Sequence, residues 1–228
     1  MELGSKKTTL CLIVLFAAAA LQAQEFRVEH KHWRKSCSGT LAVTAAGVAY
    51  TGEDHNWTWL YDDIEQLQLS EQSIRVTTYI DRRLKLGADQ QETFLFEPNQ
   101  TAASAYDTLS THLGPHLVAA LAITPKGLEI PAKLIAIVRG TQGSLFLGDD
   151  TIVFQSATPE ASRTWRLTDI DNIARTGPFR LTITTFERGH NEFQFQLKRP
   201  LAEEQYDNLW LRLNQTKGLK ILTSYKEN

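Results

Sequence analysis

Apolar and polar positions alternate in short stretches along most of the chain, which is the pattern of β-strands with one buried face. Leu41 and Val43 precede residues 44–47, and the alternation resumes with Val48 and Tyr50, so this stretch predicts a hairpin with a short turn. A second such turn is predicted at residues 148–151. Further strands are predicted around Trp57 and Trp59, Ile74 and Val76, Phe94 and Phe96, Trp165 and Leu167, Leu181 and Ile183, and Phe193 and Phe195.

The apolar spacing changes to that of a helix at two places. In both, apolar residues follow the i, i+3, i+4, i+7 spacing that makes one stripe of an amphipathic helix, with one place polar in the first. The stripes consist of Tyr106, Leu109 and Leu113, and of Tyr206, Leu209, Trp210 and Leu213. Gly114 and Pro115 predict a sharp end to the first helix.

The order of predicted strands followed by a helix occurs twice, and five groups of residues recur in that order. Their offsets vary only between groups, where turns can gain or lose residues. The offsets are 104, 106, 107, 99 and 100. The matched groups are Gly39, Leu41, Tyr50 with Gly143, Leu145, Phe154; Trp59, Asp63, Ile64 with Trp165, Asp169, Ile170; Thr77, Thr78, Tyr79 with Thr184, Thr185, Phe186; Phe94, Phe96 with Phe193, Phe195; and Tyr106, Asp107, Leu109, Leu113 with Tyr206, Asp207, Leu209, Leu213.

The repeat predicts two tandem modules, each mainly β with one C-terminal helix. We place the first at residues 24–116 and the second at residues 132–228, with an inter-module segment at residues 117–131. Pro125, Gly127 and Pro131 punctuate that segment, but residues 117–123 are apolar. A free linker would expose them, so we expect this stretch to pack against a module.

Residues 1–23 have the pattern of a secretory signal peptide: a positive start at Lys6 and Lys7, an uncharged apolar run, and a small residue at Ala23. The run covers residues 10–21, shorter than the roughly 20 residues that a membrane-spanning helix needs. We therefore predict an exported protein, periplasmic or secreted, without stable membrane anchoring. An uncleaved N-terminal anchor is the alternative.

The charge of the remaining chain limits its partners. Without Glu2, Lys6 and Lys7, it keeps 22 of the 24 basic and 25 of the 26 acidic residues. This slightly acidic balance argues against nucleic acid, whose binding proteins usually show a basic footprint. Cys37 is the one cysteine after residue 23, so no internal disulfide is possible, and we expect it to be buried.

Short antiparallel strands closed by one C-terminal amphipathic helix resemble the pleckstrin-homology-like (PH-like) superfold and its GRAM-like relatives. The Trp-x-x-x-Asp-Ile step at residues 59–64 and 165–170, followed by an apolar strand, is similar to uncharacterised exported bacterial proteins of this kind. The resemblance implies two tandem PH-like antiparallel split barrels, each plugged by its helix. Phosphoinositide-binding members use basic residues in the loop between their first two strands. Here residues 44–47 carry no charge, and residues 148–151 carry Asp149 and Asp150. A phosphoinositide headgroup is therefore not an expected ligand.

His30, His32 and Cys37 are the side chains closest to a metal-binding pattern. Alternation places the two histidines on one face, and three nitrogen and sulfur ligands suit zinc. The second module has no matching set, and no complete ligand spacing is present. We therefore interpret the stretch as a solvated strand face beside a buried Cys37, and predict no metal ligands.

No catalytic constellation is evident. The chain lacks a Gly-x-Ser-x-Gly turn and a phosphate-binding glycine-rich loop. Asp63 and Asp169 lie beside further carboxylates, Asp62 and Asp171, but recur at equivalent places in the repeat. Turn carboxylates that accept backbone N–H bonds explain both. The remaining histidines, His55, His112, His116 and His190, have no evident partners.

The sequence thus predicts a non-catalytic, exported binding or interaction protein with no cofactor and no catalytic or cofactor-binding residues. A protein or peptide partner is expected, because exposed sheet edges and the groove beside a terminal helix accept strands and helices. One alternative is a carrier of a small apolar ligand between the modules, which predicts a cavity lined by Leu117, Leu121 and Ile123. The other is an enzyme of a type that the sequence does not reveal.

Overall fold

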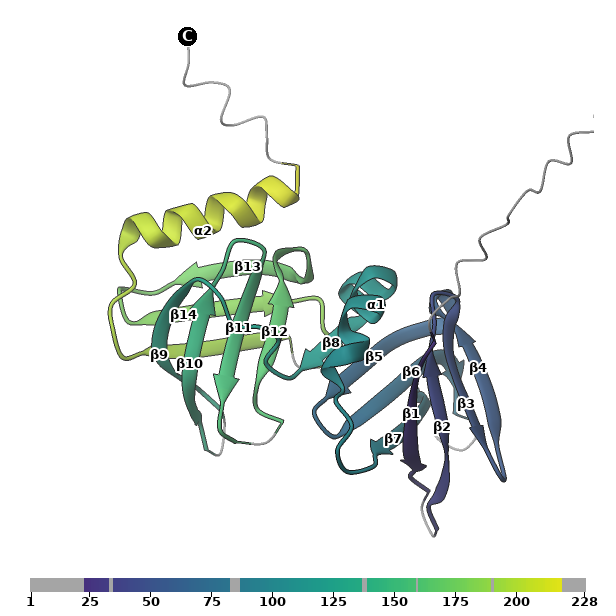
Figure 1. Ribbon diagram of the computed structural model, residues 1–228. Helices are drawn as coiled ribbons and strands as arrows, with labels where there is room; N and C mark the ends of the chain where they lie inside the picture. The colour runs from purple at the N-terminus through teal and green to yellow at the C-terminus, as the bar shows by residue number, and fades with distance from the viewer. Residues whose placement is uncertain are drawn as a thin grey trace, which may run out of the picture.

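The computed structural model describes residues 23–32, 35–82, 87–136, 139–158, 160–189 and 191–218. The predicted signal peptide lies outside these residues except for Ala23. Within them the protein is mainly β, as the alternating pattern predicted, and two groups of strands lie beside each other with β8 and α1 between them (Figure 1).

The same element order occurs twice. We call residues of β1 to α1 the first copy and residues of β9 to α2 the second copy. The first copy contains β1 (Gln24–His30), β2 (Cys37–Val43), β3 (Gly47–Gly52), β4 (Asn56–Leu60), the 3₁₀ turn η1 (Tyr61–Asp63), β5 (Ile64–Ser70), β6 (Ser73–Asp81), β7 (Asp89–Phe96) and α1 (Ala103–Leu113). The second contains β9 (Leu128–Leu134), β10 (Thr141–Leu147), β11 (Thr151–Ser156), β12 (Arg163–Arg166), η3 (Leu167–Asp169), β13 (Ile170–Arg175), β14 (Arg180–Thr185), β15 (Glu192–Leu197) and α2 (Glu203–Thr216). Between them lie η2 (Gly114–His116) and β8 (Leu117–Ala120).

Strand pairing repeats along with the element order. In the first copy β1 pairs with both β2 and β7, and in the second β9 pairs with both β10 and β15. A register shift follows Ile64 in β5, and the same shift follows Ile170 in β13. Duplication of an irregularity supports the repeat more strongly than duplicated strands do, because a β-bulge depends on local sequence.

Hydrogen bonds join all strands into one 15-stranded sheet with β13 at one end and β4 at the other. The link between the copies is β8, which pairs in parallel with β5 and, through Thr164 and Ala119, with β12. Among the described strands, β4 does not pair with β5, nor β12 with β13, so hydrogen bonding closes neither copy into a barrel.

The apolar segment after α1 packs as predicted. Residues 117–121 are all buried, and four of them form β8. The segment predicted to connect the modules, residues 117–131, therefore contains a strand of the sheet and also the start of β9 at Leu128. The exact domain boundaries remain predictions.

Each copy has its own hydrophobic core. Leu109 of α1 belongs to the cluster built by residues of the first copy and β8, and Leu209 of α2 belongs to the cluster of the second copy. Both leucines are fully buried. The helices thus cover separate cores, as the repeat predicted, although the sheet is continuous.

Most of the residues in the helical stripes are buried, while Tyr206 is partly buried. Tyr106, Leu109 and Leu113 of α1 are buried, as are Leu209 and Leu213 of α2. Trp210, which the spacing predicted to face the core, is 36% exposed. That prediction was wrong: the buried residues of α2 are Leu209 and Leu213. Gly114 ends α1 with φ of 55°, as expected of a helix-terminating glycine.

Strand pairing also corrects one of the sequence matches. Phe94 faces Ile74 across the sheet, and Phe195 occupies the same place opposite Leu181. Phe94 is therefore equivalent to Phe195 rather than to Phe193. In strands, a shift of two residues leaves the same side chains on the buried face, so an alternating Phe-x-Phe pattern does not distinguish the two registers.

Gly39 and Gly143, matched in the repeat, have a common structural role. A Cβ at Gly39 would come 2.6 Å from the ring of Tyr50, and one at Gly143 would come 2.8 Å from the ring of Phe154. Both aromatic rings lie across the glycine of the neighbouring strand. The space beside each glycine is therefore filled by a large side chain that stabilises the hairpin.

Candidate functional site

The edge of β5 in the first copy is occupied by another strand of the same chain. Residues 117–120 pair in parallel with residues 67–70 of β5. The ring of His116, the last residue of η2, donates from Nδ1 to the carbonyl oxygen of Glu65 over 2.7 Å. A short, apolar, extended segment is thus held along this edge by main-chain hydrogen bonds.

The equivalent edge in the second copy belongs to β13. Thr176 bonds through its N–H to Arg180 of β14, so by alternation Ile173 and Arg175 direct their backbone groups away from β14. Two side chains of the α2 region contact this edge: the Tyr206 hydroxyl donates to the Ile173 carbonyl over 3.2 Å, and Lys217 Nζ donates to the Asp171 carbonyl. Among the described strands, β13 pairs with β14 alone.

A hollow of about 500 Å³ lies at the C-terminal end of β13. Its lining includes Arg175, Pro178 and Leu201. Arg175 donates to the Leu201 carbonyl over 3.1 Å, and its guanidinium lies 5.4 Å from the centre of the Tyr206 ring. Phe179, next to this hollow in the chain, is 49% exposed. The open edge is therefore continuous with an accessible, partly apolar surface.

A second hollow, of about 650 Å³, lies between α1, the β10–β11 turn and the end of α2. Four charged residues line it: Asp149, Asp150, Arg166 and Arg212. Arg212 pairs with Asp149. The residues that the carrier hypothesis assigned to a cavity lie elsewhere: Leu117 and Leu121 are part of the first core, and Ile123 lines a smaller adjoining hollow of about 330 Å³.

Asp63 and Asp169 have the structural role that the sequence predicted. Asp63 Oδ2 accepts the backbone N–H of Leu60 over 3.3 Å, and Asp169 Oδ2 accepts that of Arg166 over 3.0 Å. Each carboxylate closes the turn that leads from β4 or β12 into the next strand. Asp171 instead faces Lys217, and Asp62 is exposed.

Arg166 connects this turn to the first copy. Its Nε and Nη2 donate to the two oxygens of Asp169 over 3.0 and 2.6 Å, and its Nη1 donates to the Ser110 carbonyl in the last turn of α1 over 2.5 Å. The cation therefore lies at the C-terminal end of α1, where the helix dipole favours positive charge. Hydrogen bonding to Asp169 raises the pKa of Arg166.

Arg188 also joins the copies. Its guanidinium pairs with Glu65 and Asp89, and its backbone N–H donates to the Gln66 side chain over 2.7 Å. Because Arg188 belongs to the β14–β15 loop and its partners belong to β5 and β7, these contacts position the second copy against the first.

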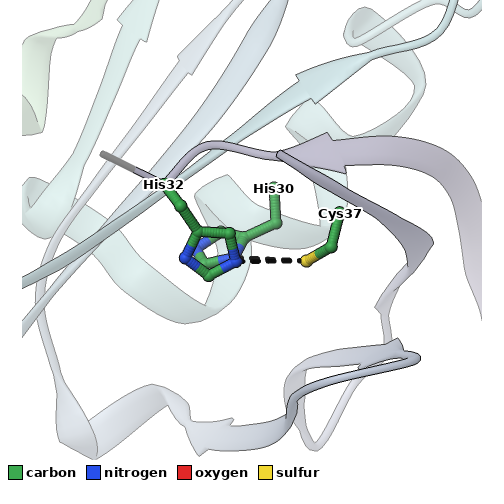
Figure 2. A group of neighbouring side chains, drawn as sticks. All are labelled: His30, His32 and Cys37. Carbon is green, nitrogen blue, oxygen red and sulfur yellow. Dashed lines mark hydrogen bonds between the residues drawn. The ribbon is translucent and has the colours of Figure 1, made fainter. Parts of the chain in front are cut away.

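His30, His32 and Cys37 are brought together at the first hairpin (Figure 2). Cross-strand pairing sets His30 of β1 directly opposite Cys37 of β2, and His32 lies in the connection between them. Their ligand atoms lie within 4.8 Å of one another. The prediction that Cys37 is buried is confirmed, but the predicted solvated face is wrong for His30, which is 1% exposed.

Aromatic side chains and one carboxylate surround His30. Glu92 Oε2 lies 2.8 Å from His30 Nε2, and the rings of Trp57 and Phe94 each lie 4.9 Å from the His30 ring. Burial lowers the pKa of His30, which favours its neutral form. The Tyr50 hydroxyl lies 3.4 Å from Cys37 Sγ, and burial also raises the pKa of this phenol. The sequence gave no sign of Glu92, because it follows His30 by more than sixty residues and approaches only through β1–β7 pairing.

The other histidines do not join this group. His112 stacks on Tyr61, and His116 bonds to Glu65 as described above. His55 stacks on Trp57 at 4.9 Å and so lies at the border of the cluster. His190 lies outside the described residues.

No protein-family model matches the chain. No curated protein matches it significantly. Among solved structures, the C-terminal domain of an unknown protein from Leishmania infantum is similar, with 14% identity, a TM-score of 0.31, and coverage of 38% of this chain and 82% of that one. The Spt16D–Pob3N heterodimer structure is similar with 10% identity, a TM-score of 0.29, and coverage of 76% and 95%. These TM-scores are low, so the architecture described here rests on the strand pairings of the chain itself.

Neither described helix, α1 nor α2, is long and apolar enough to cross a membrane.

Proposed function

We propose that the protein is a non-catalytic, exported binding protein made of two tandem PH-like split barrels, and that it binds an extended segment of a protein partner along β13. One observation carries this proposal: the equivalent edge, on β5, already holds an extended segment, β8. The chain itself therefore provides an example of the ligand that this type of edge accepts.

The PH-like part of the proposal is supported by the order of elements. Each copy has seven strands and then one helix, and its first strand pairs with both the second and the seventh. A first strand shared in this way joins a four-stranded group to a three-stranded group, as a split barrel requires. Each helix packs on the core of its own copy, which agrees with the plugging role that the resemblance implies.

The chemistry of the edge favours a peptide over other ligands. The Ile173 carbonyl now accepts a hydrogen bond from the Tyr206 hydroxyl, and a backbone N–H of an incoming strand would take the place of that hydroxyl. In the first copy, β8 pairs with the equivalent edge of β5 through its backbone. Apolar side chains like those of β8 would extend the partly apolar surface beside α2. The β10–β11 turn carries Asp149 and Asp150, whose negative charge disfavours a phosphoinositide headgroup. The slightly acidic chain also lacks the overall positive charge that nucleic acid would require.

The proposal predicts that a labelled synthetic peptide with the sequence of residues 116–122 binds the mature chain at β13. Arg175→Pro removes an N–H that faces away from β14, so peptide affinity should fall about tenfold through the lost hydrogen bond and the steric clash. Thr58→Pro, on the opposite edge strand β4, is the matched control and should leave affinity unchanged. Fluorescence anisotropy measures binding, and amide chemical shifts should change mainly in β13 and α2.

Shift changes confined to β4, or none at saturating peptide, would contradict this assignment. Binding that appears only after deletion of residues 219–228 would mean that the chain's own tail fills the edge, and the proposal of a partner peptide would fail. Because Arg175 also contacts Leu201 and Tyr206, the melting temperature of Arg175→Pro must first be shown to lie close to that of the wild type.

Export is a separate part of the proposal. It is supported by the Lys6, Lys7 and Ala23 pattern and by the start of β1 at Gln24, the first residue after the predicted cleavage point. Mass spectrometry of the secreted or periplasmic fraction of a bacterium that expresses the full chain should find a protein beginning near Gln24. Full-length chain found only in the cytoplasm would rule the idea out.

A further inference from the structure

The donor atoms of His30, His32 and Cys37 form a small triangle. His30 Nδ1 and His32 Nε2 are 3.1 Å apart, His32 Nε2 and Cys37 Sγ are 3.2 Å apart, and Cys37 Sγ and His30 Nδ1 are 3.8 Å apart. A tetrahedral zinc ion with its usual bond lengths places two nitrogens about 3.4 Å apart and a nitrogen and a sulfur about 3.6 Å apart. Each observed side is within a few tenths of an ångström of these values.

The protonation states available to the three side chains suit a cation. The Nε2 of His30 donates to Glu92, so in the neutral ring Nδ1 presents a lone pair to His32 and Cys37. A neutral His32 ring with its proton on Nδ1 presents the lone pair of Nε2 to the same point. A metal ion that takes the two lone pairs and displaces the thiol proton satisfies all three at once.

Glu92 has the place of a metal site's supporting carboxylate. Histidine ligands usually donate their second ring nitrogen to a carboxylate, which fixes the tautomer and turns the free lone pair toward the metal. Here the Glu92–His30 contact does this, and the His30 side chain is 1% exposed.

The arrangement is specific to the first copy. Pairing of β9 with β10 makes Leu134 and Thr141 the counterparts of His30 and Cys37, because Leu134 faces Thr141 as His30 faces Cys37. A role in folding common to both copies would not need the imidazole and thiol. No second group of this kind occurs elsewhere among the described residues.

We infer that His30, His32 and Cys37 bind a thiophilic metal ion of the zinc(II) or copper(I) class, with Glu92 as the residue that positions His30. Two imidazoles and one thiolate suit both ions, which favour nitrogen and sulfur over carboxylate oxygen. Three protein ligands leave one zinc coordination position for water or an exogenous ligand, and they complete a trigonal copper(I) site. Binding releases the thiol proton to solvent, and no oxidation or reduction is involved.

The test uses the mature chain kept under a reducing agent. It is titrated with Zn²⁺ against a chromophoric chelator, and separately with Cu⁺ against a copper(I) chelator. One ion of at least one metal should bind per chain. Replacement with Co²⁺ should give a thiolate-to-cobalt charge-transfer band, which reports the sulfur ligand directly.

Cys37→Ser and His32→Ala should abolish stoichiometric binding, and Cys37→Ser should also remove the charge-transfer band. Glu92→Gln should weaken metal affinity by about 10- to 100-fold while the charge-transfer band remains at saturating Co²⁺, as expected of a positioning residue. His112→Ala removes an exposed histidine outside the cluster and should change nothing, which controls for adventitious surface binding.

Stoichiometric binding that survives Cys37→Ser or His32→Ala would overturn the assignment, as would a wild-type chain that competes with neither chelator. A folded Cys37→Ser variant, checked by circular dichroism, keeps the comparison valid. The peptide site on β13 is tested independently, because Arg175→Pro should leave metal stoichiometry unchanged.

Discussion

Leu209→Ala is expected to lower the free energy of unfolding by about 2 to 5 kcal/mol, the usual cost of truncating a leucine in a packed core. The side chain is fully buried against the second core. Leu109→Ala should cost a similar amount, because Leu109 has the same place in the first core. Urea unfolding measures both. Leu211→Ala, in the same helix but 41% exposed, is the matched control and should change stability by about 0.5 kcal/mol or less.

Because the two copies have separate cores, each leucine substitution should act mainly on its own copy. Hydrogen exchange should rise mainly in the copy that carries the substitution, and the double variant should be close to additive. Because β8 connects the two halves of the sheet, it is the one element expected to respond to both. Equal acceleration of exchange throughout the chain after either substitution would show that the two copies unfold as one unit and would contradict the tandem arrangement.

Asp169→Ala is expected to cost about 2 to 4 kcal/mol, because it removes the acceptor of four hydrogen bonds and leaves the Arg166 cation without its carboxylate. Asp63→Ala is the natural control. It removes the same turn-closing bond from an exposed carboxylate that the structure pairs with no arginine, so its cost should be about 0.5 to 1 kcal/mol.

The two aspartate variants should also differ in where they act. Arg166 bonds to the Ser110 carbonyl, so loss of Asp169 should increase hydrogen exchange in the last turn of α1 as well as in η3. Asp63→Ala should affect only the η1 turn. If both substitutions lower the free energy of unfolding equally, then Asp169 adds no measurable stability by holding Arg166 against the Ser110 carbonyl.

Several parts of the fold could be predicted because they depend on local pattern. The hairpin turns at residues 44–47 and 148–151 were predicted from alternation around them and occur where expected. The roles of Asp63 and Asp169 were predictable because a turn carboxylate bonds to a backbone N–H only three residues away. Burial of Cys37 and packing of residues 117–123 also followed from composition.

Other features depended on contacts that sequence periodicity does not encode. The register of β15 was assigned two residues out, because both registers bury the same phenylalanines. Trp210 fits the helical stripe, yet it is exposed because the width of the buried face depends on how α2 lies on its sheet. The approach of Glu92 to His30 is beyond sequence periodicity for a related reason: it needs β7 to pair with β1.

By itself, the sequence determined the mainly β character, the duplication of strands and helix, and the separate burial of Leu109 and Leu209, because each follows from which side chains must leave water. Only the tertiary structure decided that β8 pairs with the edge of β5 while no described strand pairs with the equivalent edge of β13, and that His30, His32 and Cys37 meet beside Glu92. Burial periodicity specifies faces of strands and helices. Edges and side-chain clusters depend instead on which strands become neighbours, and that choice is made by the whole chain.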